Sequence, residues 1–386
     1  MYKSKELSDA RVIVVGAGAV GSCIAYRLAQ AGADVIVVER GYPSGATSGN
    51  SFAWLNAFAK FPRAYYRLNL QSIHEHRDLE WELQGNWLNL NGGVHWASSS
   101  GHSHFGDLKD SVRRMRSWGA RIEEISPDDV SARIEPGLRL GDESIESVFL
   151  VREEGWVQPA LMIQALLHRA VSEFNTTIMT DSVTGIVDGP DGIKRVSLAS
   201  GEQIDADMVV VAAGPESDRV AQMAGGCLPL TRSSGILAVT APSAALIGRV
   251  IVGPDIMMRP DGGGRLVMAS EALTSVDESD VPTQDMPQIT ALLERARELV
   301  PTLANVPFES FRKGVRSLPS DGYPIVGFDP QVSGLYYAVM HSGITLSAGI
   351  ANLVVNDLID PNFEGLATFR PDRFEEANLF QGPSGE

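Results

Sequence analysis

A glycine-rich turn near the N-terminus has the spacing of a dinucleotide-binding site. Gly16, Gly18 and Gly21 form the pattern GxGxxG directly after the β-branched run at residues 11–15. After a buried strand, the first glycine permits a tight turn, the second lets the backbone approach a pyrophosphate, and the third lets the next helix pack closely. The N–H groups at the start of that helix would face the anion. The spacing therefore predicts a phosphate-binding turn.

An acidic residue stands where such a site needs one. Residues 34–38 are expected to form a second strand that leads into Glu39, eighteen residues after Gly21. A carboxylate at this place can accept hydrogen bonds from both ribose hydroxyls of an adenosine, and it disfavours a 2′-phosphate. The site therefore favours FAD or NAD over NADP, and the motif alone does not separate these two.

A group of cations near the C-terminus could bind another anion. Arg312, Lys313 and Arg316 lie within five residues, and His341 precedes Gly343 at a second junction of strand, glycine and helix. The N-terminus of that helix could also attract negative charge. The alternatives are that Arg316 is an ordinary surface cation and that His341 is a hydrogen-bonded helix cap.

The composition is that of an acidic globular protein. The 386 residues include 48 acidic and 32 basic side chains, which gives a formal charge of -16. A field of this sign repels phosphate backbones and anionic lipid, so nucleic acid is not expected as a partner. Cys23 and Cys227 cannot form a disulfide framework, and no Cys or His spacing fits zinc. We therefore expect no metal and a cytoplasmic location.

One N-terminal segment superficially matches a secretory signal. Basic residues precede the uncharged run at residues 12–26, and small residues follow it. However, a strand followed by glycines makes a poor continuous helix, so the signal is the less favoured interpretation. No other run approaches the ~20 apolar residues of a membrane span, and we expect no membrane insertion.

The elements that must position these residues alternate between helical and strand periods. Between the first two strands, apolar residues recur at helical spacing over residues 20–31, and residues 208–214 form a buried run that ends in small residues. Such a run is typical of a central parallel strand whose carboxyl edge approaches a ligand. Residues 228–270 are expected to form antiparallel strands, including a hairpin through residues 261–264. A further hairpin is expected at residues 87–96.

Taken together, these segments resemble the D-amino-acid oxidase, glycine oxidase and sarcosine oxidase family of FAD-dependent amine oxidoreductases, over nearly the whole chain. The resemblance rests on the order of the motifs as well as on each motif. In chain order they are the GxGxxG turn with Glu39, the loop at residues 46–50, the Gly-Trp-Val-Gln-Pro run at 155–159, the run at 209–214, the segment 314–327 and the junction at 341–346.

The resemblance implies an α/β fold with two interleaved domains. A Rossmann-like FAD-binding domain of the glutathione-reductase type would alternate along the chain with an α+β substrate domain built on an antiparallel sheet. The FAD-binding domain would comprise residues 1–85, 151–222 and 316–386, and the substrate domain residues 86–150 and 223–315.

The implied cofactor is FAD, bound without a covalent link. Family members that attach flavin covalently use Cys or His, whereas Gly314 stands at the cysteine position here and no histidine lies between Ser44 and Phe58. The motif and the resemblance together assign these residues to the cofactor: Gly16, Gly18, Ala19, Val20, Gly21, Glu39, Arg40, Thr47, Ser48, Asn50, Val183, Ala213, Gly214, Gly343, Ile344 and Thr345.

Three residues are implied at the substrate. The segment from Gly314 to Pro324 resembles the part of glycine oxidase in which an arginine grips the substrate carboxylate, which assigns this role to Arg316. A guanidinium fork suits the task because it donates two parallel hydrogen bonds. Glycine oxidase has a second arginine where this chain has His341, so a fixed cation is replaced by a group that titrates near neutrality. Met257 falls at a substrate-site position, with ordinary core packing as the alternative.

The implied reaction is oxidation of the C–N bond of a small amine or amino acid, of the D-amino-acid or N-alkyl-glycine type, by hydride transfer to flavin. The resulting imine would hydrolyse. No catalytic acid or base is predicted, because the cofactor carries the chemistry. Oxygen or another acceptor would take the electrons, and a homo- or hetero-oligomer is possible.

Three alternative functions stay open at this point. The chain could be a 2-hydroxy-acid dehydrogenase of the same fold. It could be the catalytic subunit of a multisubunit amine, opine or hydroxyproline dehydrogenase. It could also be a module that binds NAD or flavin without catalysis.

Overall fold

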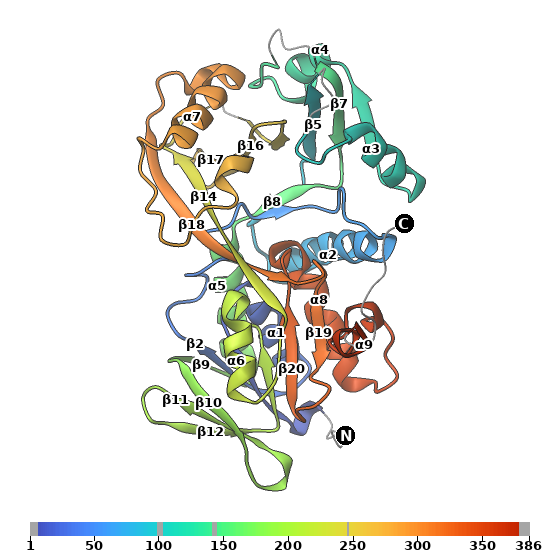
Figure 1. Cartoon of the computed structure of the whole chain (residues 1–386), viewed down its shortest axis with the longest axis vertical. Coiled ribbons are helices and arrows are strands. Elements are labelled where there is room, and N and C mark those ends of the chain that lie inside the picture. The colour runs from blue at the N-terminus through green and yellow to red at the C-terminus, as the bar shows by residue number, and fades with distance from the viewer. Residues whose placement is uncertain (1–6, 99–102, 141–144, 245–246, 378–386) are drawn as a thin grey trace.

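The computed structural model describes residues 7–98, 103–140, 145–244 and 247–377. Two large sheets dominate it, with a parallel sheet in the lower half of Figure 1 and an antiparallel sheet in the upper half. The chain passes between the two halves several times, so each sheet is built from separate stretches of sequence.

The lower sheet has six strands, and all of them run parallel except the edge strand β19. Val15 pairs with both Val38 and Val211, so the three central strands end at the same edge. This edge is where open α/β sheets bind ligands. In order across the sheet, the strands are β19 (Ile325–Phe328), β20 (Leu335–Val339), β13 (Met208–Val211), β1 (Arg11–Val15), β2 (Asp34–Glu39) and β9 (Thr176–Thr180).

Both faces of this sheet are buried, as its continuous β-branched runs predict. Val12 and Val14 pack into a cluster with the helices, while Ile13 and Val15 pack into a second cluster on the opposite face. The first cluster includes residues of α1 (Ala19–Gln30), α2 (Arg63–Glu82), α5 (Pro159–Glu173) and α8 (Gly343–Ile359). The second includes residues of α6 (Ser217–Met223) and of a three-stranded sheet of β10 (Val183–Asp188), β11 (Lys194–Leu198) and β12 (Gln203–Ala206).

The upper sheet has eight strands, which are antiparallel except for the pair β15 and β5. α7 (Pro287–Leu299) packs on one of its faces. In Figure 1 the paired strands β14 and β18 run from this sheet down toward the lower half. In order, the strands are β18 (Phe308–Pro319), β14 (Leu230–Thr240), β17 (Arg265–Ala269), β16 (Met257–Asp261), β15 (Val250–Val252), β5 (Gly93–Ser98), β7 (Ile145–Val151) and β6 (Ile122–Ile125).

Shorter elements complete the fold. β8 (Gly155–Val157) lies between the two large sheets in Figure 1, and it pairs with β3 (Trp54–Leu55) and β4 (Leu88–Asn89). The remaining α-helices are α3 (Leu108–Ser117), α4 (Pro127–Asp129) and α9 (Arg373–Ala377). In the part of the chain that is described, no helix combines the length and the apolar character needed to cross a membrane.

The predicted interleaved α/β fold is confirmed, and so is the hairpin through residues 261–264, which β16 and β17 form. The domain boundaries stay a prediction. The strands of the six-stranded sheet lie within residues 11–39, 176–211 and 325–339, and the proposed boundary after residue 315 falls inside β18.

The predicted hairpin at residues 87–96 is wrong. β4 pairs with β8, whereas β5 pairs with β7 and β15, so the strands on either side of Asn91 belong to different sheets. Gly92 turns the chain with a φ of +88°, and its N–H donates to the carbonyl of Glu154 at 3.0 Å. β5 lies between β15 and β7 in the eight-stranded sheet, so both of its edges are occupied and β4 cannot pair with it. The turn therefore directs the chain into a new sheet.

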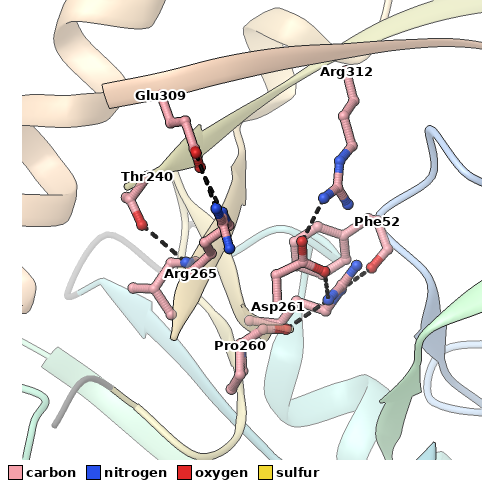
Figure 2. A network of polar contacts seen from close by, with 9 residues as sticks. Phe52, Thr240, Pro260, Asp261, Arg265, Glu309 and Arg312 are labelled. Carbon is pink, nitrogen blue, oxygen red and sulfur yellow. Dashed lines mark hydrogen bonds and ion pairs between the residues drawn. The ribbon is translucent and has the colours of Figure 1, made fainter. Parts of the chain in front are cut away.

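A buried arginine links the eight-stranded sheet to the loop before β3. Arg259 in β16 is fully buried, and its Nε donates to the carbonyl of Phe52. Its Nη1 donates to Asp261 Oδ1 at 3.0 Å, and Asp261 also accepts from Arg312, as Figure 2 shows. The guanidinium lies 5.2 Å from the ring centroid of Trp156. Burial lowers the pKa of Arg259 to about 10, against the opposing effect of the Asp261 carboxylate. Arg259 therefore stays charged at neutral pH.

We expect replacement of Arg259 with Leu to lower the free energy of unfolding by about 3 kcal/mol, the lower end for loss of one partner from a buried ion pair, because Arg312 still pairs with Asp261. The control is Arg265→Leu on the same hairpin. Arg265 pairs with Glu309 at the surface (Figure 2), and exposed ion pairs contribute little. Urea unfolding followed by tryptophan fluorescence measures both variants, and equal losses would contradict the assigned role.

Candidate functional site

The glycine turn brings α1 as close to the sheet as a backbone allows. A Cβ on Gly21 would lie 2.0 Å from the carbonyl oxygen of Gly16, and a Cβ on Gly16 would lie 2.6 Å from that of Ala212. Gly16 also has a φ of +105°, which disfavours any L side chain. These contacts place the N-terminus of α1 at the carboxyl edge of the sheet.

Glu39 and Ser48 hold this turn from two sides. Glu39 Oε2 accepts from the N–H of Ala17 at 2.8 Å, and Oε1 accepts from the N–H of Gly41 at 3.0 Å. Ser48 Oγ accepts from the N–H of Ala19 at 3.0 Å. A carboxylate has about four acceptor positions, so Glu39 retains capacity for the hydroxyls of a ligand.

A cavity of about 640 Å³ extends from this turn to the eight-stranded sheet. All the residues predicted to bind substrate or cofactor contribute to its wall, except Gly21 and Asn50. Gly21 lies behind the wall, where it packs on Gly16. Asn50 instead shapes the loop of residues 45–51, because its Nδ2 donates to the carbonyls of Gly45 and Ala46 at 3.2 and 2.8 Å. A direct contact of Asn50 with a cofactor stays a prediction.

The same loop is bonded to the strand that carries the predicted substrate arginine. Thr47 Oγ1 donates to the carbonyl of Val315, the residue before Arg316 in β18. A Cβ on Gly314 would lie 3.2 Å from the carbonyl oxygen of Asn50, so the strand and the loop approach closely. The predicted cofactor loop and the predicted substrate arginine therefore share one wall of the cavity.

Arg316 is fixed in this wall without an acidic partner. Its Nη2 donates to Ser233 Oγ at 2.6 Å and to the carbonyl of Thr274. Its Nε is buried and has no hydrogen-bond partner, and among the described residues no carboxylate lies within 4.0 Å of the guanidinium. Burial lowers the pKa of Arg316, yet a guanidinium remains charged. The arrangement leaves a positioned cation facing the cavity.

His341 and Lys60 lie near Arg316. His341 follows β20 and is open to the cavity, but the surrounding protein removes most of its water. This burial, together with the charges of Lys60 and Arg316, lowers the pKa of His341 to about 4. Burial also lowers the pKa of Lys60 to about 8. At pH 7 the positive charge near His341 therefore comes from Arg316 and Lys60, and His341 is neutral.

The N-terminus of α8 closes the wall between these groups. Ser342, the N-cap residue, accepts at its Oγ from Lys60 Nζ at 3.1 Å and from the Tyr65 hydroxyl at 3.0 Å. Thr345 Oγ1 donates to the carbonyl of Trp54 at 3.0 Å, which ties the helix to β3. A helix N-terminus carries positive partial charge, so α8 adds to the potential that the two cations create.

Met257 has features of both a substrate-site residue and an ordinary core residue. It lies in the wall of the cavity, and it is only 7% exposed within an apolar cluster that includes Trp156 and Val252. Trp54 and Phe105 add aromatic surface to the same part of the wall. The chain thus surrounds the cations with apolar groups.

Sequence reasoning missed several residues of the wall, of which Lys60 matters most. It lies on a loop after β3 that contains none of the recognised motifs. The available signal was its isolation, because Lys60 is the only charged residue between positions 52 and 61. The other residues missed by the sequence reasoning include Trp54, His104, Phe105 and Thr274.

The wall fits FAD at the positions that can be tested. The first N–H groups of α1 have no partner within the helix and lie at the cavity, as a pyrophosphate requires. Gly214 has a φ of +57°, and a Cβ on it would meet no atom within 4 Å, so it faces open space. In the described ranges, no group of three or more His, Cys, Asp or Glu side chains could hold a metal ion.

Known proteins match the chain over nearly its full length. An opine oxidase subunit of Agrobacterium tumefaciens (strain Ach5) is 25% identical over 374 residues, which cover 94% of this chain and 96% of that protein. Glycine oxidase of Geobacillus kaustophilus (strain HTA426) is 25% identical over 359 residues, which cover 90% of this chain and 92% of that protein.

Solved structures agree in fold. A crystal structure of glycine oxidase from Geobacillus kaustophilus has a TM-score of 0.81 at 23% identity and covers 94% of this chain and 98% of its own. Iminodiacetate oxidase from Chelativorans sp. BNC1 has a TM-score of 0.78 at 21% identity and covers 94% of this chain and 99% of its own.

The family model described as DAO, FAD dependent oxidoreductase, matches residues 11–356. This match confirms the predicted family, the FAD cofactor and the assignment as an enzyme. It includes the glycine turn, Glu39, the strand of Arg316 and the start of α8, which together form the wall described above. The chain belongs to the DAO family of FAD-dependent oxidoreductases.

Proposed function

We propose that this enzyme oxidises the C–N bond of a small amine that carries a carboxylate, such as a D-amino acid or an N-alkyl glycine. The imine that forms would then hydrolyse in solution. One observation carries the proposal: Arg316 presents a guanidinium to the cavity, with no described acidic partner. A carboxylate is the group that matches this fork best. The relatives named glycine oxidase and opine oxidase support oxidation of an amine.

Bound FAD supplies the two-electron acceptor for this reaction. The turn at Gly16 and Gly18, with Glu39 and Ser48, would hold its adenosine and pyrophosphate portions. The start of α8 would face its ring, where a helix N-terminus stabilises negative charge.

The residues of the wall contribute position and electrostatics. Arg316 holds the carboxylate, while Met257 and the aromatic side chains limit the access of water. An amine must lose its ammonium proton before it can be oxidised. The nearby charges of Arg316 and Lys60 favour this loss, because like charges destabilise an ammonium ion. The proton passes to solvent water before the amine binds, so this scheme requires no separate catalytic base.

A second candidate is the catalytic subunit of a multisubunit dehydrogenase. The Agrobacterium tumefaciens relative favours it, because that protein is named as one subunit of an opine oxidase. Peroxide formation by the isolated chain would indicate oxygen as the acceptor, whereas turnover only with an added artificial acceptor would favour a partner chain. We also propose a cytoplasmic location. Cys23 and Cys227 are both free thiols, as is usual in a reducing compartment.

The test of the reaction is anaerobic reduction of the bound flavin. D-amino acids, N-methylglycine and proline analogues should bleach its visible absorbance, and 2-hydroxy acids of matched size should not. Bleaching by hydroxy acids alone would show that the chain is a 2-hydroxy-acid dehydrogenase instead. A chain that binds FAD but is bleached by neither class would contradict the enzyme proposed here.

We expect the FAD to be bound non-covalently. Gly314 occupies the position at which cysteine attaches flavin in some members, and no histidine lies between Ser44 and Phe58. Precipitation of the holoenzyme with trichloroacetic acid should therefore leave the yellow colour in the supernatant. A yellow pellet after washing would show a covalent bond.

Replacement of Arg316 with Ala should raise KM for carboxylate-bearing amines about 10- to 100-fold, the equivalent of one charge-assisted hydrogen-bonded contact. Arg316→Lys should give an intermediate value, because it keeps the charge and loses the fork. Arg297→Ala, an exposed change on α7, is the matched control and should leave KM unchanged. Steady-state kinetics measure all three variants, and an unchanged KM for Arg316→Ala would exclude its proposed role.

The pH dependence should carry no contribution from His341 near neutrality. Its lowered pKa of about 4 means that the imidazole is protonated only well below pH 5.5. We expect His341→Gln to change the magnitude of KM without adding or removing an inflection between pH 5.5 and 7.5. Profiles of KM against pH for both enzymes test this expectation. The loss of an inflection near pH 6.5 in the variant would show that His341 titrates normally.

A further inference from the structure

Lys60 is a second cation of the cavity wall, on a different element from Arg316. Its Nζ donates to Ser342 Oγ at 3.1 Å and lies 5.8 Å from the ring centroid of Tyr65. Within the part of the chain that is described, no carboxylate lies within 4.0 Å of this ammonium group. By contrast, Lys109 pairs with Glu146 at 3.0 Å and Lys194 pairs with Asp188. Lys60 therefore lacks the carboxylate partner that Lys109 and Lys194 have. Lys313 also has none among the described residues, but it donates to three backbone carbonyls.

The groups around Lys60 give its ammonium charge little stabilisation. The nearest acidic influence is Glu154, whose charge favours the ammonium form. However, Glu154 Oε2 already accepts from His95 Nε2 at 2.8 Å and from Trp54 Nε1 at 3.3 Å. The ammonium also lies at the N-terminus of α8, where the helix dipole is unfavourable to a cation. A cation held in such a place is stabilised if an anion binds beside it.

Lys60 and Arg316 act on the same part of the cavity. Both lower the pKa of His341, which lies between the end of β20 and the start of α8. Arg316 reaches the cavity from β18, and Lys60 reaches it from the loop after β3. The wall thus offers two separately anchored positive groups, and one carboxylate bound by Arg316 would leave the other unpaired.

We propose that Lys60 binds a second carboxylate of the substrate, so that the preferred substrate is a secondary amine with one carboxylate on each of its two carbon substituents. This inference rests on the proposed function for the position of the amine. The occupancy of the two anion positions does not depend on turnover. The two cations would hold the substrate at both ends, which fixes the central C–N bond more firmly than a single clamp does.

The experiment uses a pair of inert ligands that differ by one carboxylate. Diglycolate carries an ether oxygen between two carboxymethyl groups, and methoxyacetate replaces one of its carboxylates with hydrogen. Neither contains an amine, so binding to the FAD-loaded protein is measured without reaction. Isothermal titration calorimetry and the shift of the flavin spectrum give Kd for each ligand. We expect the wild-type protein to bind diglycolate about 10- to 100-fold more tightly, as one additional charge-assisted contact would produce.

Four variants test which residue causes the tighter binding of diglycolate. Lys60→Met removes the charge at similar length and should abolish most of the preference for diglycolate, whereas Lys60→Arg should retain part of it. Lys109→Met makes the same chemical change at the surface and should leave the preference intact. Arg316→Ala should weaken both ligands. Flavin content and the thermal midpoint verify that each variant is folded.

Equal binding of the two ligands to wild-type protein overturns the proposal, whatever the behaviour of the variants. An unchanged preference in Lys60→Met overturns it as well, even if that variant alters the rate of flavin reoxidation. If the diglycolate preference depends on Lys60 but no amine reduces the flavin, the second carboxylate position stands and the proposed reaction is wrong. If amines are oxidised and the preference is absent, the reaction stands and the role of Lys60 is wrong.

Discussion

The close approach of the β1–α1 turn to the end of β13 is the constraint on which the rest of the site depends. No side chain fits at Gly16 or Gly21, since each would collide with a backbone oxygen. The N-terminus of α1 is therefore held at the edge where the parallel strands end. β20 ends at the same edge and leads into α8, so two helix N-termini face one cavity. A parallel sheet makes this convergence possible, because all its strands end on one side.

The second sheet matters because it is bonded to this edge at specific points. Thr47 joins the cofactor loop to the carbonyl of Val315, and Arg259 holds the carbonyl of Phe52 from inside β16. Thr47 lies within the loop of residues 45–51, which lines the cavity, and Phe52 follows this loop directly. Arg316 follows Val315 directly, so a displacement of the loop would also move the guanidinium that we propose binds the substrate. Geometry at the two positions is therefore coupled through the backbone.

The sequence was sufficient for what depends on local chemistry. The glycine turn, Glu39 and the strand of Arg316 are recognisable because each needs particular residue types at short spacing, and nearly all of the predicted residues line one cavity. Pairing over long distances was not recognisable in the same way. Residues 87–96 contain hairpin signals, but Gly92 passes the chain between two sheets, since the choice of partner depends on strands far away in sequence. Lys60 was missed for a related reason, because only the fold brings its loop to the start of α8.

The positive wall also shows how an acidic protein could attract the carboxylate-bearing substrate that we propose. The net charge of -16 describes the whole surface, whereas the acidic groups nearest the cavity are already bound by other donors. Of the acids that line it, Glu39 accepts from two backbone N–H groups, Asp181 from the N–H groups of Ser182 and Ser200, and Glu216 from Arg219. None of the three pairs directly with Lys60 or Arg316. Because the cavity limits the access of water, the field of these two cations acts over a longer distance there than it would at the surface. Local pairing of the acids, rather than an excess of bases, makes this part of the molecule positive.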